Sequence, residues 1–281
     1  MFKKSFVDET FDYNMTSHYE LSIQLSLDGF SFLVYDVTRN KFIACLLHPL
    51  NETAREEPST ALKDVLAHNE LTQHRYHKVR VINQTHRYTL VPEAYLSPGN
   101  IKAYFSFNHK LGDAEELHAT ELRPHKAVVL HALSSNMTNL LRQYFPTFEI
   151  FHQTLPFLRR VELANNYEVC LGVNVSSEHI DVALLQGTKK MLKLVKSYPF
   201  KTAADVIYWL LSVTQKQKLP PTVPILFNGN FPDTSFRDTI KKEFTHVKWL
   251  PEQSNEYTVS YQFHQIPLKV IANQLNLVHC E

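Results

Sequence analysis

Hydrophobic residues in the first part of the chain gather in three short runs that turn residues separate. The runs are Glu20–Leu27, Phe30–Val37 and Lys41–Leu47. In the first run, polar and apolar positions alternate strictly, which is typical of a half-buried strand. A helical spacing follows, since Leu62, Val65 and Leu66 share one face and Ser59 or Thr60 is a suitable cap. The pattern predicts three meandering strands and then a helix.

The same order of elements returns in the second half of the chain. Strand-like runs cover Glu168–Val175, His179–Leu185 and Met191–Tyr198, and Thr202 caps a predicted helix over Ala203–Gln215. In each half a strand, a helix and another strand come next, and a connecting helix predicts that the two strands pair in parallel. These strands are Ala127–Leu133 and Phe148–Phe151, and then Val223–Phe227 and Val247–Leu250.

The segment around 71–123 has no counterpart in the second half. It contains the strand-like runs Lys78–Ile82 and Tyr88–Val91, and we interpret it as an inserted subdomain. Leu155–Asn165 has the pattern of a helix that joins the halves. The sequence thus predicts a first half over 1–165, with the insertion around 71–123, and a second half over 166–281.

A strand, an Asp28-Gly29 turn, two more strands and a helix, met again after residue 166, resemble the actin-like ATPase superfamily. The resemblance lies in element order and covers most of the chain. The chain is also similar to an uncharacterised bacterial domain-of-unknown-function family with degenerate nucleotide motifs. The resemblance implies an α/β fold of two ribonuclease-H-like halves, with mixed sheets and flanking helices.

In that superfamily, Mg-ATP lies between the halves, where one hairpin of each half wraps the phosphates. The resemblance therefore implies three groups of cofactor-binding residues, should ATP bind: the first turn, the second turn and the turn near the nucleotide base. They are Asp28 and Gly29, then Asn174, Ser176 and Ser177, then Asn228 and Gly229.

The chain departs from the superfamily pattern at two of these turns. A phosphate cradle needs consecutive backbone N–H groups that point inward, which glycine allows best, and the chain has only six glycines. Asn174 is neutral where a carboxylate is expected, and Gly229 stands where the pattern has two glycines. Asp-Gly is also a common hairpin turn. We therefore expect no catalytic residue and no cofactor.

These departures favour a non-catalytic protein that binds a partner protein, or itself, as a scaffolding module. The alternative is a divergent ATP-binding enzyme or ATPase that uses Asp28 for its metal ion. A third hypothesis is a nuclease in which Asp28, Asp36 and Asp181 hold metal ions. Solvated strand positions explain Asp36 and Asp181 more simply.

Amino-acid composition limits the classes of partner that we expect. Lys and Arg number 29 against 28 Asp and Glu, so no charged field attracts nucleic acid or a membrane surface. The N-terminus lacks the apolar core of a signal peptide, which predicts a cytoplasmic protein. Cysteines Cys45, Cys170 and Cys280 are odd in number and far apart, as expected for reduced packing residues.

The histidines do not indicate a metal site. The densest group has no cysteine nearby, so exposed side chains are expected there. This group is His68, His74, His77 and His86. His131 and His152 interrupt apolar strands and are predicted to be hydrogen-bonded core or edge residues. A basic run from Lys189 to Lys196 is typical of an edge strand.

Overall fold

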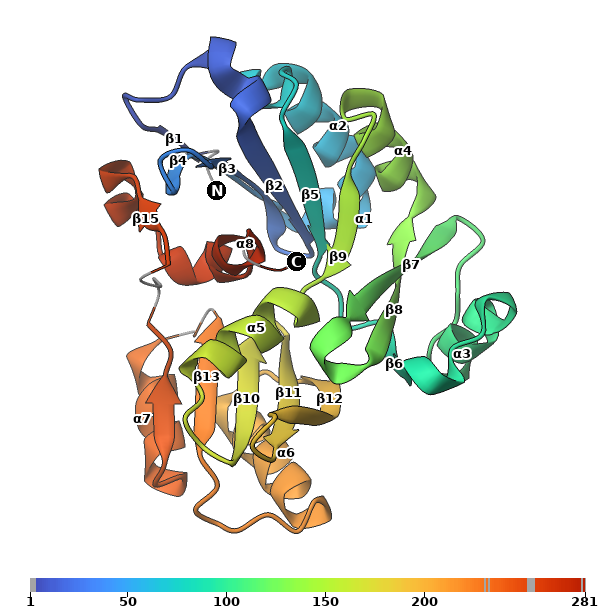
Figure 1. Cartoon of the computed structure of the whole chain (residues 1–281), viewed down its shortest axis with the longest axis vertical. Helices are drawn as coiled ribbons and strands as arrows, with labels where there is room; N and C mark the ends of the chain where they lie inside the picture. Colours follow the sequence, from blue (N-terminus) through green and yellow to red (C-terminus); the bar gives the residue numbers. More distant parts are fainter. Residues whose placement is uncertain (1–3, 230, 232, 252–255, 279, 281) are drawn as a thin grey trace.

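The computed structural model describes every residue except 1–3, 230, 232, 252–255, 279 and 281. Two lobes, each built on its own β-sheet, stand one above the other, and a smaller sheet with one helix lies beside them (Figure 1). The first lobe lies at the top, mostly in blue to teal with green, yellow-green and red segments from later in the chain, and the second lobe, in yellow to orange, lies at the bottom.

The first lobe contains a seven-stranded sheet in the order β1-β4-β3-β2-β5-β9, with β15 paired to β4. Strands β2, β3 and β4 form an antiparallel meander, and β5 runs parallel to both β2 and β9. The strands are β1 (Lys4–Val7), β2 (Tyr19–Ser26), β3 (Gly29–Asp36), β4 (Lys41–Pro49), β5 (Lys78–Asn83), β9 (Glu149–His152) and β15 (Thr258–Val259).

Helices cover both faces of this sheet. On one face, Leu62, Val65 and Leu66 of α2 (Pro58–His68) join a buried core with α4 (Ser135–Tyr144). The predicted apolar face is therefore confirmed, although the helix begins at Pro58 and its cap position is Glu57 instead of Ser59 or Thr60. The opposite face packs against the C-terminal segment, which includes α8 (Ala272–Leu277).

The second lobe contains a five-stranded sheet in the order β12-β11-β10-β13-β14. One face packs on α6 (Ala203–Lys216) and α7 (Thr234–Glu243), and the other on α5 (Thr154–Ala164). Thr202 caps α6 as predicted, in a capping box with Asp205. The strands are β10 (Val169–Val175), β11 (His179–Gln186), β12 (Met191–Pro199), β13 (Ile225–Gly229) and β14 (Val247–Trp249). The lysine-bearing β12 is an edge strand, which confirms the prediction from its charge.

The third sheet has three antiparallel strands in the order β6-β8-β7 and packs against α3 (Ile101–Asn108). Its strands are β6 (Tyr88–Pro92), β7 (Glu115–Leu122) and β8 (Ala127–Ser134). The remaining short elements are α1 (Glu52–Glu56) and the 3-10 turns η1 (Tyr13–His18), η2 (Glu70–Thr72), η3 (Glu93–Tyr95), η4 (Pro98–Asn100), η5 (Arg123–His125), η6 (Tyr261–Gln265) and η7 (Leu268–Ile271).

The strand pairing predicted for the first half was wrong. Ala127–Leu133 does not pair with Phe148–Phe151, because β8 lies between β6 and β7 in the small sheet. The parallel partner of β9 is instead β5, which sequence analysis had assigned to the insertion. In the second half the parallel pairing of β13 with β14 is confirmed. The crossover from β5 to β9 thus includes the whole small sheet as well as α4.

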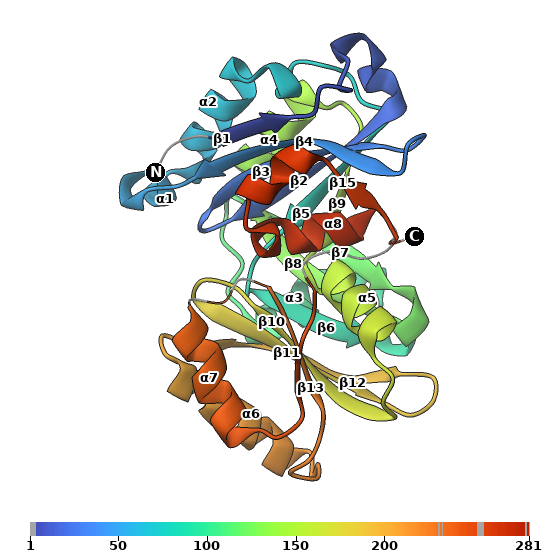
Figure 2. The same cartoon turned by 90° about the vertical axis from the view of Figure 1, so that its left-hand side faces the viewer.

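The C-terminal segment crosses back to the first lobe. After β14 the chain adds β15 beside β4, and Phe263, Ile271 and Leu275 then pack against the first sheet. Figure 2 shows α8 lying between that sheet and α5. The division of the chain at residue 165 stays a prediction, but the described part of residues 256–278 contacts the first sheet.

Candidate functional site

The predicted turn residues meet where the two lobes face each other. One cavity, of about 60 Å³, is lined from both lobes. The first lobe contributes Asp28, and the second contributes Asn174, Ser176, Ser177 and Gly229. A second cavity, of about 30 Å³, lies against Asp28, Ser176 and Ser177 as well. We call the residues around these two cavities the seam. Asn228 lies directly behind it.

Gly29 and Gly229 have structural roles at the seam. Gly29 has φ +150°, and a Cβ there would lie 2.4 Å from the carbonyl oxygen of His48. Gly229 has φ +97°, and a Cβ there would lie 2.3 Å from the carbonyl oxygen of Val175. Side chains at these positions would therefore collide with backbone atoms of β4 and β10. Each glycine allows its turn to close against a neighbouring strand.

One backbone amide of each turn is already hydrogen-bonded within the protein. The N–H of Asp28 donates to the Ser26 hydroxyl over 3.2 Å, and the N–H of Ser176 donates to the carbonyl of His179 over 2.9 Å. The carbonyl of Asp28 also accepts from the N–H of Leu50 over 2.8 Å. These bonds hold the turns in hairpin geometry.

Side chains connect the lobes directly across the seam. Gln84, the residue after β5, donates from Nε2 to the Ser176 hydroxyl over 2.8 Å. Arg55 contacts the Asp28 carboxylate at 3.1 Å and that of Glu178 at 3.7 Å. All three charged side chains are more than a third exposed, so these ion pairs contribute little stability.

Two histidines form a further contact between the lobes. The rings of His86 and His179 stack with centroids 4.0 Å apart and an interplanar angle of 5°. Burial and then the neighbouring His179 lower the pKa of His86. Burial lowers the pKa of His179 as well, so both rings are more readily neutral at physiological pH, which makes their stacking favourable.

A buried polar network lies on the second-lobe side of the seam. Asn228 donates to Asn174 over 2.9 Å, and Asn174 donates to the Asp181 carboxylate over 3.3 Å. Burial raises the pKa of Asp181, although several hydrogen bonds to its carboxylate oppose that rise. The other donors are Ser197, Gln153 at 3.3 Å and Tyr88 at 3.5 Å. Asn174 therefore uses its amide to hold strands together.

The solvated positions expected for Asp36 and Asp181 were wrong, because only 3% and 2% of these residues are exposed. Both faces of each central sheet are covered, so a polar residue on an inner strand can be buried whichever side it points to. Asp36 pairs with Arg39 at 3.0 Å, at the end of β3 far from the Asp28 turn. Asp36 does not line either seam cavity, so the three aspartates do not form one site.

The described residues contain no group of three or more His, Cys, Asp or Glu side chains that could hold a metal ion. His68 is exposed and pairs with Asp64. His131 and His152 are fully buried and hydrogen-bonded, as predicted; His152 contacts the carbonyl of Thr85 over 2.9 Å. Cys45, Cys170 and Cys280 are buried free thiols, also as predicted.

Sequence reasoning missed several seam residues. Ser176 accepts a hydrogen bond from Gln84, and Asp28 pairs with Arg55. The Asp181 carboxylate accepts hydrogen bonds from Gln153, Tyr88 and Ser197. A signal existed for Gln84, because side chains at the carboxyl ends of parallel strands meet at one edge of a sheet. It was hidden because β5 had been placed in the insertion.

Comparison with known proteins identifies the fold. The model of a family described as "Protein of unknown function (DUF3822)" matches residues 8–247. No curated protein matches the chain. In the part of the chain that the structure describes, no helix is long and apolar enough to cross a membrane.

Two solved structures are similar. A Bacteroides thetaiotaomicron VPI-5482 protein with an actin-like ATPase fold and unknown function is 20% identical, with a TM-score of 0.82, and the match covers 97% of this chain and 100% of that one. A PilM–PilN type IV pilus biogenesis complex gives 13% identity and a TM-score of 0.50, over 93% and 98% of the chains. The predicted α/β actin-like ATPase fold is confirmed.

Proposed function

We propose, from the premise that the chain belongs to the family described as a protein of unknown function (DUF3822), that it is a non-catalytic binding or scaffolding protein on an actin-like ATPase fold. Its partner in this proposal is another protein or a second copy of the chain. The observation that carries the proposal is that protein side chains occupy the space between the lobes.

The size of the seam cavities supports this. At about 60 and 30 Å³ they are far smaller than the roughly 300–1,000 Å³ of ordinary small-molecule sites. The adjoining cavity of about 210 Å³, which shares Gln84 and His86 with the seam, is also below that range and is lined by residues of the first half alone. Gln84 and Ser176 bridge the lobes where a nucleotide would have to lie. Opening this space would break that bond and separate the stacked rings of His86 and His179.

The hydrogen bonding of the turns supports it as well. A triphosphate needs unpaired backbone N–H groups, and the N–H groups of Asp28 and Ser176 are already bonded. Asn174 supplies no negative charge to a metal ion, and its side chain is bonded to Asn228 and Asp181. These bonds at the described seam residues support the proposal that Mg-ATP does not bind there.

The partner in this proposal is a protein. A solved structure with a similar fold is a PilM–PilN type IV pilus biogenesis complex, so a protein of this fold can take part in a protein assembly. The near balance of charge does not favour nucleic acid or a membrane surface. The proposal places the protein in the cytoplasm, where Cys45, Cys170 and Cys280 stay reduced.

The test is thermal unfolding of the full chain with and without millimolar Mg-ATP, together with an assay of phosphate release. We expect no change in Tm and no turnover above a buffer control. A rise in Tm of several degrees would show that ATP binds the folded state. The Asp28→Asn variant then separates the alternatives: it should abolish turnover in a divergent ATPase, whereas in a scaffold it should change the Tm only slightly.

A further inference from the structure

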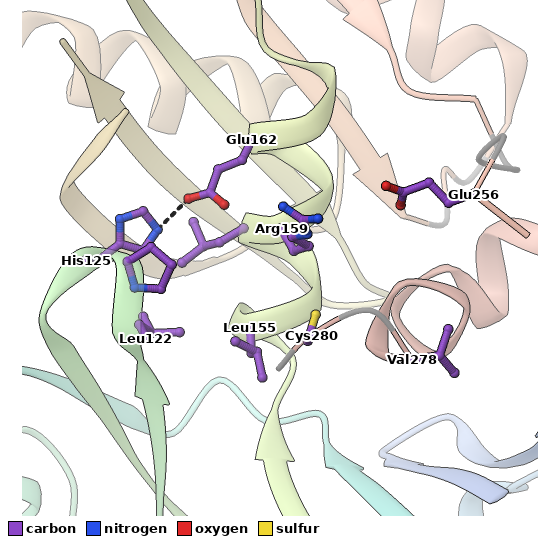
Figure 3. A pocket seen from close by; sticks show the side chains of 10 residues that line it. Leu122, His125, Leu155, Arg159, Glu162, Glu256, Val278 and Cys280 are labelled. Atoms are coloured by element: carbon purple, nitrogen blue, oxygen red, sulfur yellow. Dashed lines mark ion pairs between the residues drawn. The ribbon is translucent and has the colours of Figure 1, made fainter. Parts of the chain in front are cut away.

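The largest cavity described here lies away from the seam. It has a volume of about 540 Å³, within the range of small-molecule sites. Three parts of the chain line it: the corner between β7 and β8, helix α5 and the C-terminal segment (Figure 3). None of the seven turn residues of the candidate ATP site lines it.

The cavity combines an apolar wall with a few polar groups. Leu122, Leu155 and Leu158 supply apolar surface from the corner and from α5, and Val278 adds to it from the C-terminal segment. Figure 3 shows α5 between the corner that carries His125 and the segment that carries Glu256 and Val278. Such a mixture of apolar wall and few polar groups is typical of ligand pockets.

The acidic side chains of the cavity already have partners. Glu162 accepts an ion-pair contact from His125 Nε2 at 2.7 Å, and its backbone carbonyl accepts from Lys190 Nζ at 2.7 Å. Glu256 interacts electrostatically with Arg160. The protein itself thus partly balances these carboxylates.

Two buried nitrogens of the cavity have no hydrogen-bond partner among the described residues. One is Nε of Arg159, and the other is Nδ1 of His125, a residue that is only 9% exposed. A buried donor without an acceptor is unfavourable, because it has given up its hydrogen bonds to water. Arg159 also makes no ion pair with any described residue, so its guanidinium is a cation beside an apolar wall.

We propose that this cavity binds a carboxylate carried on an apolar body. The carboxylate pairs with Arg159, whose planar guanidinium can donate two parallel hydrogen bonds to such a group. The apolar body lies against Leu122, Leu155 and Leu158. Because the carboxylate of Glu162 only accepts, His125 donates to it from Nε2, and this contact fixes the imidazole beside the cavity.

This ligand chemistry has two sources, a free aliphatic acid and the C-terminal residue of a peptide. The experiment uses octanoate with octanamide as its neutral counterpart, and acetyl-Ala-Leu with its C-terminal amide. Binding to the full chain is measured by calorimetry. We expect one carboxylate of the two to bind at least about tenfold more tightly than its amide, as one charged hydrogen bond allows.

The Arg159→Gln variant should remove this preference for the carboxylate, while Arg75→Gln, at an exposed arginine outside the cavity, should keep it. In the wild-type protein, the bound carboxylate should shift the imidazole NMR signals of His125. Leu155→Trp, which fills the cavity, should weaken binding of acid and amide alike. Failure of both carboxylates to bind at millimolar concentration, or binding that Arg159→Gln leaves unchanged, overturns the proposal. Neither result bears on the proposed function, which concerns the seam.

Discussion

The β2–β3 hairpin and the β10–β11 hairpin occupy equivalent places in the two lobes, and the polar residue that the resemblance assigns to each is used differently. In the first lobe Asp28 stays 43% exposed and pairs with Arg55 at the surface. In the second lobe Asn174 lies within β10, before the turn, where it is buried and joins Asn228 to Asp181. A charge can remain at a turn only where water reaches it, whereas a neutral amide can be buried when its bonds are satisfied.

The comparison extends to the titratable groups behind each turn. The first lobe places His152 at the end of β9, and the second places Asp181 on β11, with Tyr88 in contact with both. Burial disfavours the charged form of each, so it lowers the pKa of the histidine and raises that of the aspartate. The two lobes should therefore lose stability at opposite ends of the pH range.

The largest expected effect is the loss of stability in acid through His152. Burial lowers the pKa of His152 to about 3, whereas the unfolded chain takes up this proton below its ordinary value of about 6.5. The unfolded state therefore binds more protons as the pH falls, which removes about 3 kcal/mol between pH 7 and pH 4. Urea denaturation at several pH values measures this. His152→Gln should flatten the dependence, and an unchanged slope in that variant would contradict the assignment.

The next prediction concerns the glycines of the turn after β2 and of the end of β13, which allow the backbone to close against a neighbouring strand. Gly229→Ala and Gly29→Ala should each cost about 3 kcal/mol in unfolding free energy, because the added Cβ meets a backbone oxygen. Gly187→Ala is the matched control: its φ is also positive, at +82°, but nothing lies within 4 Å of the new Cβ. It should cost about 1 kcal/mol. Equal losses at Gly187 and Gly229 would remove the role assigned to close packing.

The carboxylates of the two lobes can be compared directly. Asp181→Ala leaves the donors of Asn174, Ser197 and Gln153 without their acceptor, so it should lower the unfolding free energy by about 2 kcal/mol. Asp28→Ala should lower it by less than about 1 kcal/mol, because its ion pair is exposed. Chemical denaturation at pH 7 decides between them. A larger loss for Asp28→Ala would reverse the comparison.

The raised pKa of Asp181 adds a pH signature of opposite sign to that of His152. Stability from this group is fully present below about pH 3.9 and is lost as the pH rises through the folded pKa. Asp181→Asn cannot ionise, so it should gain stability relative to the wild type between pH 4 and pH 8. A constant difference across that range would show that the folded pKa is not raised.

The smallest expected effect concerns the contact that joins the two lobes. A double-mutant cycle of Gln84→Ala and Ser176→Ala should give a coupling energy of about 1 kcal/mol, the net value of one hydrogen bond. The pair Arg55→Ala and Glu178→Ala, at 3.7 Å and exposed, is a control that should couple more weakly. No coupling between Gln84 and Ser176 would mean that the seam is open in solution.

Several elements could be predicted from the sequence because their signals are local. The three-strand meanders, the Thr202 cap of α6 and the apolar face of α2 all follow from periodicity over a few residues. The meeting of Asp28 with Asn174 and Ser176 came from the resemblance, since nothing in either turn alone indicates the other. The arrangement of elements was therefore more predictable than the contacts between them.

By itself, the sequence determined the elements, most of their faces and the scarcity of glycine at the turns. Only the tertiary structure decided that β5 joins the first sheet, that β8 leaves it, and that Asp181 is buried. Periodicity reports how one segment divides its own surface. Which strand pairs with it, and what covers its second face, depends on segments far away in the chain, such as the C-terminal residues that pack on β3 and β4.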